Sequence, residues 1–134
     1  MSYLYLLDTN ILSELIRHPQ GRIFEYIAEV GEDKVYTSIV AACELKFGAA
    51  KGCSERIKQQ VSKTLDALPI LPLTSPVEVR YAALRVYLEQ AGTPIGPNDL
   101  PIASQALTLG LVVVTANVRE FERVPDLSVE NWLI

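Results

Sequence analysis

The chain opens with the stretch Tyr3-Leu4-Tyr5-Leu6-Leu7-Asp8-Thr9-Asn10, residues 3–10, in which a short apolar run ends abruptly in polar residues. Apolar residues then recur at helical spacing, at Ile11, Leu12, Leu15 and Ile16. This pattern predicts a buried strand followed directly by a helix, with Asp8 at the carboxyl end of the strand. The order of strand, carboxylate and helix is the first indication of an α/β fold.

The same alternation of strand-like and helix-like segments continues to the end of the chain. Strands are predicted at Val35–Thr37, Ile70–Leu73, Leu111–Thr115 and, at the edge of the sheet, Leu127–Trp132. Helices are predicted from Ser38, as N-cap, to about Ala50, and over Ile57–Leu68, Val77–Gln90 and Leu100–Gly110, with Ala116–Arg123 as a loop and turn. No repeat or linker divides these segments. We therefore expect one three-layer α/β/α domain with a mainly parallel sheet of four or five strands.

Four acidic residues stand out in this pattern: Asp8, Glu44, Asp99 and Glu120. The first three lie where an apolar or turn segment gives way to a helix, and Glu120 follows the apolar run Leu111–Val114. Side chains at the carboxyl ends of parallel strands converge on one crevice, so these carboxylates are expected to meet. Such a cluster, without cations, is typical of a site for a hard divalent metal. Taken singly, each residue is more simply explained as a turn, cap or solvated residue, and spacing alone leaves the two explanations evenly matched.

Histidine and cysteine are too sparse to support other common kinds of site. His18 is the only histidine, and Cys43 and Cys53 do not form a CxxC pair. Neither a zinc site nor a Ser-His-Asp triad is therefore expected. Both cysteines are interpreted as ordinary reduced thiols.

The apolar stretches of the chain are short. Leu4–Leu7 and Leu109–Val114 are far shorter than the roughly 20 apolar residues that a membrane-spanning helix needs. The start lacks a basic region, and Asp8 interrupts the apolar run too early for a signal peptide. We expect a cytoplasmic protein.

The formal net charge of −4 is the opposite of the usual footprint of a nucleic-acid-binding module. It counts less against a metal nuclease, because bound divalent ions offset a carboxylate cluster. A local basic rim could then carry the phosphate contacts. The candidates are Arg119 and Arg123 beside Glu120, with Lys46 and Lys51 after Glu44, although each is also explained as part of a solvated helix face.

Four motifs give the chain a more specific resemblance. They are Leu7-Asp8-Thr9-Asn10, Ser38 followed by Glu44-Leu45 and Phe47-Gly48, the segment Gly92-Thr93-Pro94-Ile95-Gly96-Pro97-Asn98-Asp99, and the segment from Val114 to Phe121. In order and spacing they resemble the PIN-domain ribonucleases and, within them, the VapC-type toxins of bacterial toxin–antitoxin pairs. The resemblance extends to Glu130-Asn131-Trp132 and implies a single PIN-like domain over residues 1–134.

The resemblance implies roles for individual residues. Asp8, Glu44 and Asp99 match the three acidic metal ligands, and Glu120 matches a fourth acidic position that completes the catalytic set. Asn117 is the second choice for that fourth position, through metal-bound water. Further polar residues are expected to hold the carboxylates or waters by hydrogen bonds: Thr9, Asn10, Ser38 and Thr115. Arg119 is expected to contact a substrate phosphate.

The resemblance also implies a cofactor, a substrate and partners. Mg²⁺ is the expected metal, with Mn²⁺ as a substitute, and the expected reaction is endonucleolytic cleavage of a single-stranded RNA loop, by analogy in the anticodon loop of initiator tRNA. A homodimer and a small inhibitory antitoxin over the acidic pocket are expected. Four residues either line the antitoxin groove or, as we prefer, form core: Ile11, Leu12, Leu15 and Ile16.

Two other functions are considered. Asp8-Thr9-Asn10 after a strand faintly resembles the phosphatases with an aspartyl nucleophile, although Asn10 stands where their pattern has a second aspartate. The other alternative is a non-catalytic binding module that retains the PIN fold without the activity.

Overall fold

The computed structural model describes residues 4–52 and 54–134 of the chain. Within these residues, five strands form one sheet in the order β3-β2-β1-β4-β5, and each neighbouring pair is parallel. The strands are β1 (Tyr5–Leu7), β2 (Val35–Ser38), β3 (Ile70–Leu71), β4 (Val112–Val114) and β5 (Val129–Glu130). The predicted parallel sheet is therefore confirmed, with β1 at its centre.

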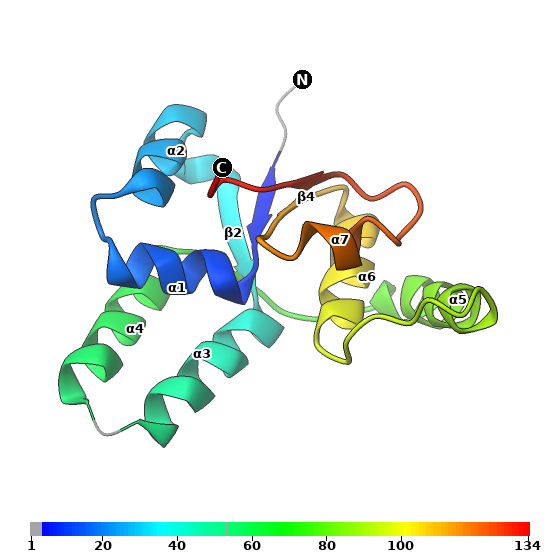
Figure 1. Cartoon of the computed structure of the whole chain (residues 1–134), viewed down its shortest axis with the longest axis horizontal. Helices are drawn as coiled ribbons and strands as arrows, with labels where there is room; N and C mark the ends of the chain where they lie inside the picture. Colours follow the sequence, from blue (N-terminus) through cyan, green and yellow to red (C-terminus); the bar gives the residue numbers. More distant parts are fainter. Residues whose placement is uncertain (1–3, 53) are drawn as a thin grey trace.

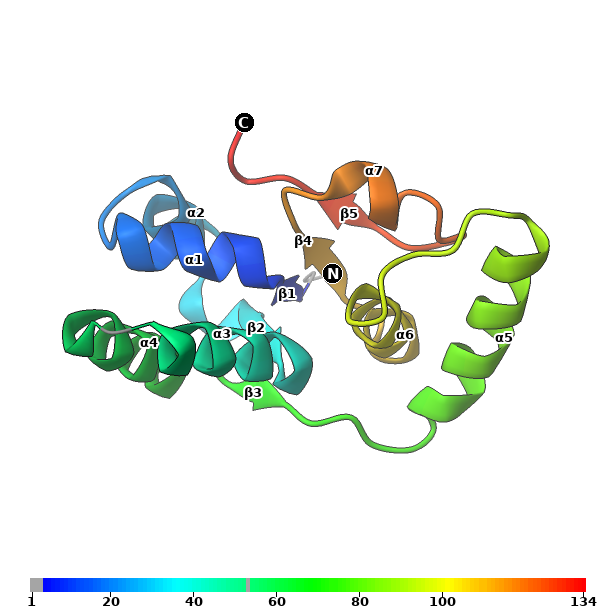
Figure 2. The same ribbon diagram turned by 60° about the horizontal axis from the view of Figure 1, so that its bottom comes forward.

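Helices cover both faces of this sheet. They are α1 (Thr9–Arg17), α2 (Arg22–Val30), α3 (Ile39–Lys51), α4 (Glu55–Ala67), α5 (Val77–Gln90), α6 (Asp99–Leu109) and α7 (Val118–Phe121), with a 3₁₀ turn, η1 (Glu32–Lys34). Figures 1 and 2 show α1–α4 on one side of the sheet and α5–α7 on the other, which confirms the three-layer α/β/α prediction. In the described ranges, none of the helices is long and apolar enough to cross a membrane.

The central strand is buried on both faces, because its side chains alternate between two hydrophobic clusters. Leu7 packs into the cluster under α1–α4, together with Val35 and Val114. Leu6 packs with Val113 into the cluster under α5 and α6. Because strand side chains pack into both clusters, the sheet is held rigidly, and so are the residues that follow each strand.

Most predicted elements are present with shifted ends. Ser38 does cap α3, and Gly110 ends α6 in the left-handed conformation, with a φ of 69°. The predicted strand at Ile70–Leu73 is cut to two residues, since Pro72 has no backbone N–H to donate to a neighbouring strand. The segment Ala116–Arg123 contains the one-turn helix α7, which was not predicted. The expectations for Tyr3 in the first strand and for the thiol of Cys53 lie outside the described residues.

The C-terminal tail is fastened to the α1–α4 side by an aromatic group. Trp132 is 1% exposed and stacks on Tyr26, with ring centroids 4.9 Å apart and an interplanar angle of 6°. Its ring also lies 5.2 Å from that of Tyr5, and its Nε1–H donates to Glu130 Oε1 at 2.9 Å. This residue therefore links the edge strand β5 to α2 and to the central strand.

We predict that Trp132→Ala lowers the free energy of unfolding by about 3–5 kcal/mol, because it leaves a cavity in the core. Urea unfolding followed by far-UV circular dichroism measures the change. Ile134→Ala, two residues away at an 82% exposed position, is the matched control and should change stability by less than about 0.5 kcal/mol. Equal effects of the two substitutions would contradict the role assigned to Trp132.

Candidate active site

The candidate site lies at the carboxyl edge of the sheet, between β1 and β4. The chain leaves β1 towards β2 on one side and reaches β4 on the other, so this is the switch point at which open α/β sheets bind ligands. Asp8 follows β1 directly and caps α1, and its backbone N–H continues the parallel ladder by donating to Val114 O at 2.9 Å. The ladder thereby places Asp8 next to Thr115, the first residue after β4.

The carboxylate of Asp8 is 3% exposed and is held on both oxygens. The backbone N–H of Thr9 donates to Oδ1 at 2.8 Å. The hydroxyl of Thr115 donates to Oδ2 at 2.8 Å, and the Asn10 amide lies 3.4 Å from the same oxygen. Asn10 also accepts from the backbone N–H of Ala116 at 2.9 Å, which ties the end of β1 to the end of β4. Asp8 is therefore immobilised by neutral donors.

Glu44 projects from the middle of α3 and is held from two sides. The Thr9 hydroxyl donates to Oε1 at 2.7 Å, so Thr9 bridges Asp8 and Glu44 through its backbone and its side chain. The Asn98 amide donates to Oε2 at 3.1 Å. Because Asn98 immediately precedes Asp99, Glu44 is connected to the start of α6.

Asp99 and Glu120 form the other half of the cluster, and Asn117 lies between them. The Asn117 amide is 3.3 Å from Asp99 Oδ2 and 2.5 Å from Glu120 Oε2. The backbone N–H of Gly96 donates to Glu120 Oε1. A Cβ atom on Gly96 would lie 3.3 Å from that carboxylate oxygen, so a larger residue here would have to displace the Glu120 carboxylate slightly.

Burial and mutual repulsion act on the protonation of these groups. Burial raises the pKa of Asp8, and the negative charge of Glu44 adds to the rise. Burial also raises the pKa of Asp99, to about 7, with the charges of Asp8, Glu120 and Glu44 contributing. Burial of Glu120 opposes its ionisation, but hydrogen bonds from Gly96 and Asn117 lower its pKa. Asp99 is therefore the carboxyl group that holds a proton most readily near neutral pH.

No positive charge compensates the cluster at short range. In residues 4–52 and 54–134, none of the four carboxylates lies within ion-pairing distance of a lysine, arginine or histidine. Arg123 helps to lower the pKa of Glu120, and it donates to Pro94 O at 3.0 Å. The hydrogen-bond donors thus satisfy the oxygen atoms but leave the negative charge uncompensated.

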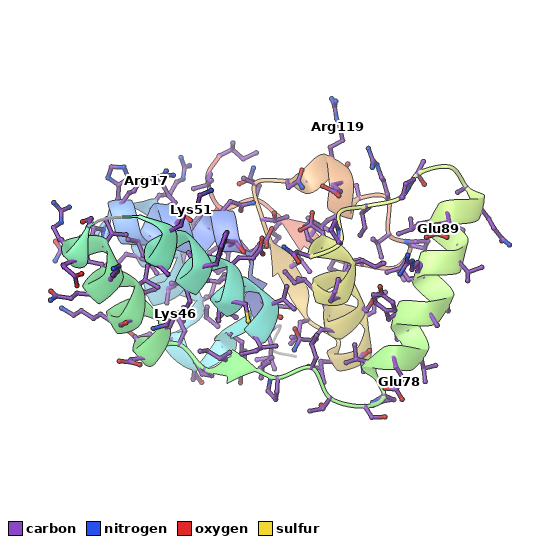
Figure 3. All side chains as sticks on the ribbon, turned by 90° about the horizontal axis from the view of Figure 1, so that it is seen from below. Arg17, Lys46, Lys51, Glu78, Glu89 and Arg119 are labelled. Carbon is purple, nitrogen blue, oxygen red and sulfur yellow. The ribbon has the colours of Figure 1, made fainter. Side chains whose placement is uncertain are left out.

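Two expected site residues lie apart from this network. The Ser38 hydroxyl accepts from the Val40 backbone N–H at 3.1 Å, so it caps α3, and none of its described hydrogen bonds reaches a carboxylate. Arg119 is exposed on α7, and Figure 3 shows its side chain directed outwards from the body of the protein.

Two residues of the network were not identified from the sequence as site residues, Gly96 and Asn98. Asn98 stands at the N-cap position of α6, yet its side chain makes no capping hydrogen bond and turns to Glu44 instead. Its position directly before an acidic helix start was the available signal. Gly96 acts through its backbone N–H, for which the sequence carries no signal beyond the glycine itself.

The kinds of ligand atom in the cluster suit a hard divalent cation. All the available ligand atoms are carboxylate or amide oxygens, which magnesium and manganese prefer. In the part of the chain that the structure describes, no group of three or more acidic, histidine or cysteine side chains is placed so that it could hold a metal ion as it stands. The carboxylates point to hydrogen-bond donors, while the raised pKa values of Asp8 and Asp99 show that their negative charge is incompletely stabilised.

A separate groove lies among α1, α2 and α4, with a volume of about 420 Å³. Leu15 and Ile16 line it together with the half-exposed Phe24. Ile11 and Leu12 are fully buried and belong to the core. Ile16 thus belongs both to the core and to the groove wall, and Leu15 lines the groove while packing against the core.

Comparison with known proteins finds relatives over nearly the whole chain. The PIN domain family matches residues 5–127. Ribonuclease VapC2 of Rickettsia felis is 36% identical over 133 residues, covering 96% of this chain and 98% of that protein. The tRNA(fMet)-specific endonuclease VapC of Salmonella typhimurium is 34% identical over 129 residues, covering 96% and 97%. The crystal structure of DNA-bound VapBC from Salmonella typhimurium superposes with a TM-score of 0.90 at 34% identity, covering 97% and 98%.

We predict that Asp99→Asn stabilises the metal-free protein more at about pH 8 than at about pH 5. A carboxyl group with a folded pKa of about 7 against an ordinary 3.8 binds more protons when the protein is folded. Its contribution to stability is therefore lost as the pH rises through this window. Asparagine does not titrate and so removes that loss. The stabilisation by Asp99→Asn should therefore be larger at about pH 8 than at about pH 5 by on the order of 1 kcal/mol, after allowing for solvent screening of a half-exposed group. Thermal unfolding of the wild type and of Asp99→Asn, in EDTA at both pH values, measures this difference in stability.

Asp66→Asn, at an exposed position on α4 outside the cluster, is the matched control for this experiment. An effect of Asp99→Asn that is the same at both pH values would contradict the electrostatic description of the cluster.

Proposed function

The chain belongs to the PIN-domain family, among its VapC members, and we propose that it is a single-domain endoribonuclease toxin that hydrolyses RNA in a single-stranded loop. The observation that carries the proposal is the network joining Asp8, Glu44, Asp99 and Glu120 at the switch point of the sheet. A half-buried concentration of negative charge costs folding free energy. Binding of a cation that acts on a phosphodiester would explain its presence.

The proposed cofactor is Mg²⁺, with Mn²⁺ as a substitute. Asp8, Asp99 and Glu44 would hold it, because they supply hard oxygen ligands and their mutual repulsion would be relieved by a divalent ion. When bound, such an ion lowers the pKa of a coordinated water and offsets charge on the phosphate oxygens.

The side chains around the cluster have distinct parts in this mechanism. Thr9 and Asn98 hold one Glu44 oxygen each, which fixes the carboxylate to bind the metal or orient the attacking water. Asn10 and Thr115 fix Asp8 in the same way. These neutral donors fix the positions of the two carboxylates and leave their negative charge available to a cation.

Glu120 and Asn117 complete the negative pocket on the other side. The backbone N–H of Gly96 and the Asn117 amide hold both Glu120 oxygens, so Glu120 would act through water. Arg119, exposed on the rim one residue earlier, would contact a substrate phosphate.

The proposed substrate is a tRNA, and by analogy the anticodon loop of the initiator tRNA. The support is the relative named tRNA(fMet)-specific endonuclease, which matches 96% of this chain. Unstacked loop bases can be splayed into a protein site, whereas a duplex hides them. The compartment that fits such a substrate is the cytoplasm.

The proposed partners are a second copy of the chain and a small inhibitory antitoxin. The crystallised relative is a VapBC complex, and it matches this chain over its whole fold. The 420 Å³ groove among α1, α2 and α4 provides an apolar surface on which an antitoxin segment could dock before covering the acidic pocket.

The two competing functions have less support. The phosphatases with an aspartyl nucleophile have a second aspartate two positions after the first, and Asn10 stands at that position in this chain. A non-catalytic module would have no use for four mutually repelling carboxylates.

We predict that purified, antitoxin-free protein cleaves bacterial total RNA with Mg²⁺ or Mn²⁺ and not with EDTA. Asp8→Asn is expected to slow cleavage by about 100-fold or more, the loss typical of removing a charge-stabilising group from an active site. Sequencing of the new RNA ends identifies the cut position, and Mn²⁺ titration calorimetry reports the metal site independently.

The control for cleavage is Glu89→Gln on α5, which neutralises an exposed carboxylate outside the cluster. Cleavage by Asp8→Asn at the wild-type rate would exclude Asp8 from the mechanism. Absence of both cleavage and Mn²⁺ binding in the wild-type chain would favour the binding module.

A further inference from the structure

An aromatic side chain on α3 stands in solvent next to the acidic cluster. Phe47 is 67% exposed, whereas the buried face of the same helix consists of other residues: Ala41, Ala42, Leu45 and Ala49. Its ring therefore contributes little to the core. Phe47 follows Glu44 by three residues, so both lie on one side of the helix, about 4.5 Å apart along its axis.

A cation continues this line of side chains. Lys51 follows Phe47 by four residues, and its Nζ lies 5.8 Å from the centroid of the Phe47 ring. Along the helix axis, Lys51 is about 10.5 Å from Glu44. The stripe formed by Glu44, Phe47 and Lys51 thus runs from the proposed site of cleavage, across an aromatic ring, to an ammonium group.

The charges around the site favour this side for a polyanion. Figure 3 shows Lys46 and Lys51 on α3, and Glu78 and Glu89 on α5 at the opposite side of the molecule. Within the described part of the chain, neither lysine forms an ion pair with a carboxylate. On α5, Arg85 is paired with Glu89 at 2.9 Å, so its charge is already balanced.

We propose that Phe47 and Lys51 form a subsite for single-stranded RNA, in which the Phe47 ring stacks on a base beside the scissile phosphate and Lys51 contacts the adjoining backbone phosphate. The inference rests on the proposed ribonuclease function and adds a place where the strand is held. Stacking on an aromatic ring tolerates any base, so this subsite supplies affinity and alignment rather than sequence specificity. Lys51, already above the ring, needs only a change of rotamer to reach a phosphate.

A nucleotide fits this surface better than a protein partner does. The exposed residues that surround Phe47 on α3 are small or charged: Cys43, Lys46, Gly48, Ala50 and Lys51. A ring isolated among lysines lacks the contiguous apolar patch at the centre of a stable protein interface. It matches the combination of a flat base and an anionic backbone.

The test is binding of a short single-stranded RNA oligonucleotide that carries 2-aminopurine, measured in EDTA so that it is not cleaved. Fluorescence anisotropy gives affinity, and quenching of 2-aminopurine reports stacking. Phe47→Leu is expected to weaken binding by between about 5-fold and about 150-fold, as for loss of one stacked base, and to abolish the quenching. Phe47→Trp should retain both. Lys51→Gln should reduce the slope of log affinity against log salt by about 0.7.

Tyr87→Leu on α5, at a 51% exposed aromatic position, is the matched control and should bind the oligonucleotide like the wild type. Because Phe47 is exposed, Phe47→Leu should unfold at the wild-type temperature. Unchanged affinity and quenching in Phe47→Leu would overturn the subsite, and wild-type cleavage of RNA would then leave the proposed function intact. Unchanged affinity with a native mass halved by Phe47→Leu would assign the surface to contacts between copies of the chain. If the wild type neither binds nor cleaves RNA, both proposals fail.

Discussion

The parallel pairing of β1 with β2 on one side and with β4 on the other determines where every polar group of the site lies. Leu7 is in register with Thr37 and with Val114, so the residues that follow these strands emerge side by side at one edge of the sheet. The backbone N–H of Asp8 donates to Val114 O and completes the ladder at this edge. Because β1 is packed between two hydrophobic clusters, its carboxyl end cannot shift, and the position of Asp8 relative to Thr115 and α3 is fixed by the core.

At this edge of the sheet, carboxylates that repel one another are brought together and held by neutral hydrogen-bond donors. Threonine hydroxyls, asparagine amides and backbone N–H groups donate to both oxygens of Asp8, Glu44 and Glu120 and to one oxygen of Asp99, without adding positive charge. A lysine or arginine in place of these neutral donors would stabilise the fold, but it would also neutralise the negative charge of the carboxylates. Because the negative charge of the cluster is left uncompensated, the pKa of Asp99 is raised. Under the proposed function, the protein gives up some stability in order to keep a site at which a cation can bind, as is common at functional sites.

The sequence predicted the parts of this arrangement that depend on local pattern. Short apolar and β-forming runs located the strands, and helical spacing located most helices. The boundaries of these segments singled out Asp8 and Asp99, whereas Glu44 lies in the middle of α3. The pattern failed where tertiary contacts decide. The loop before Asp99 approaches Glu120 through the backbone of Gly96, and Asn98 spans 54 positions of sequence to reach Glu44. Ser38 has the sequence of a site residue but is used to cap α3. The side chains of Asn98 and Ser38 each have local and distant partners available, and Gly96 acts through its backbone. Spacing alone determines none of these outcomes.

The central claim is that the carboxylate cluster exists to bind a divalent cation. The most direct measurement is an anomalous difference map from crystals of the antitoxin-free protein soaked in manganese chloride. We expect a peak at the switch point, bonded to oxygens of Asp8 and Asp99 at roughly 2.0–2.2 Å and lost in Asp99→Asn. A map with full occupancy of other manganese positions but no peak among these carboxylates would contradict it.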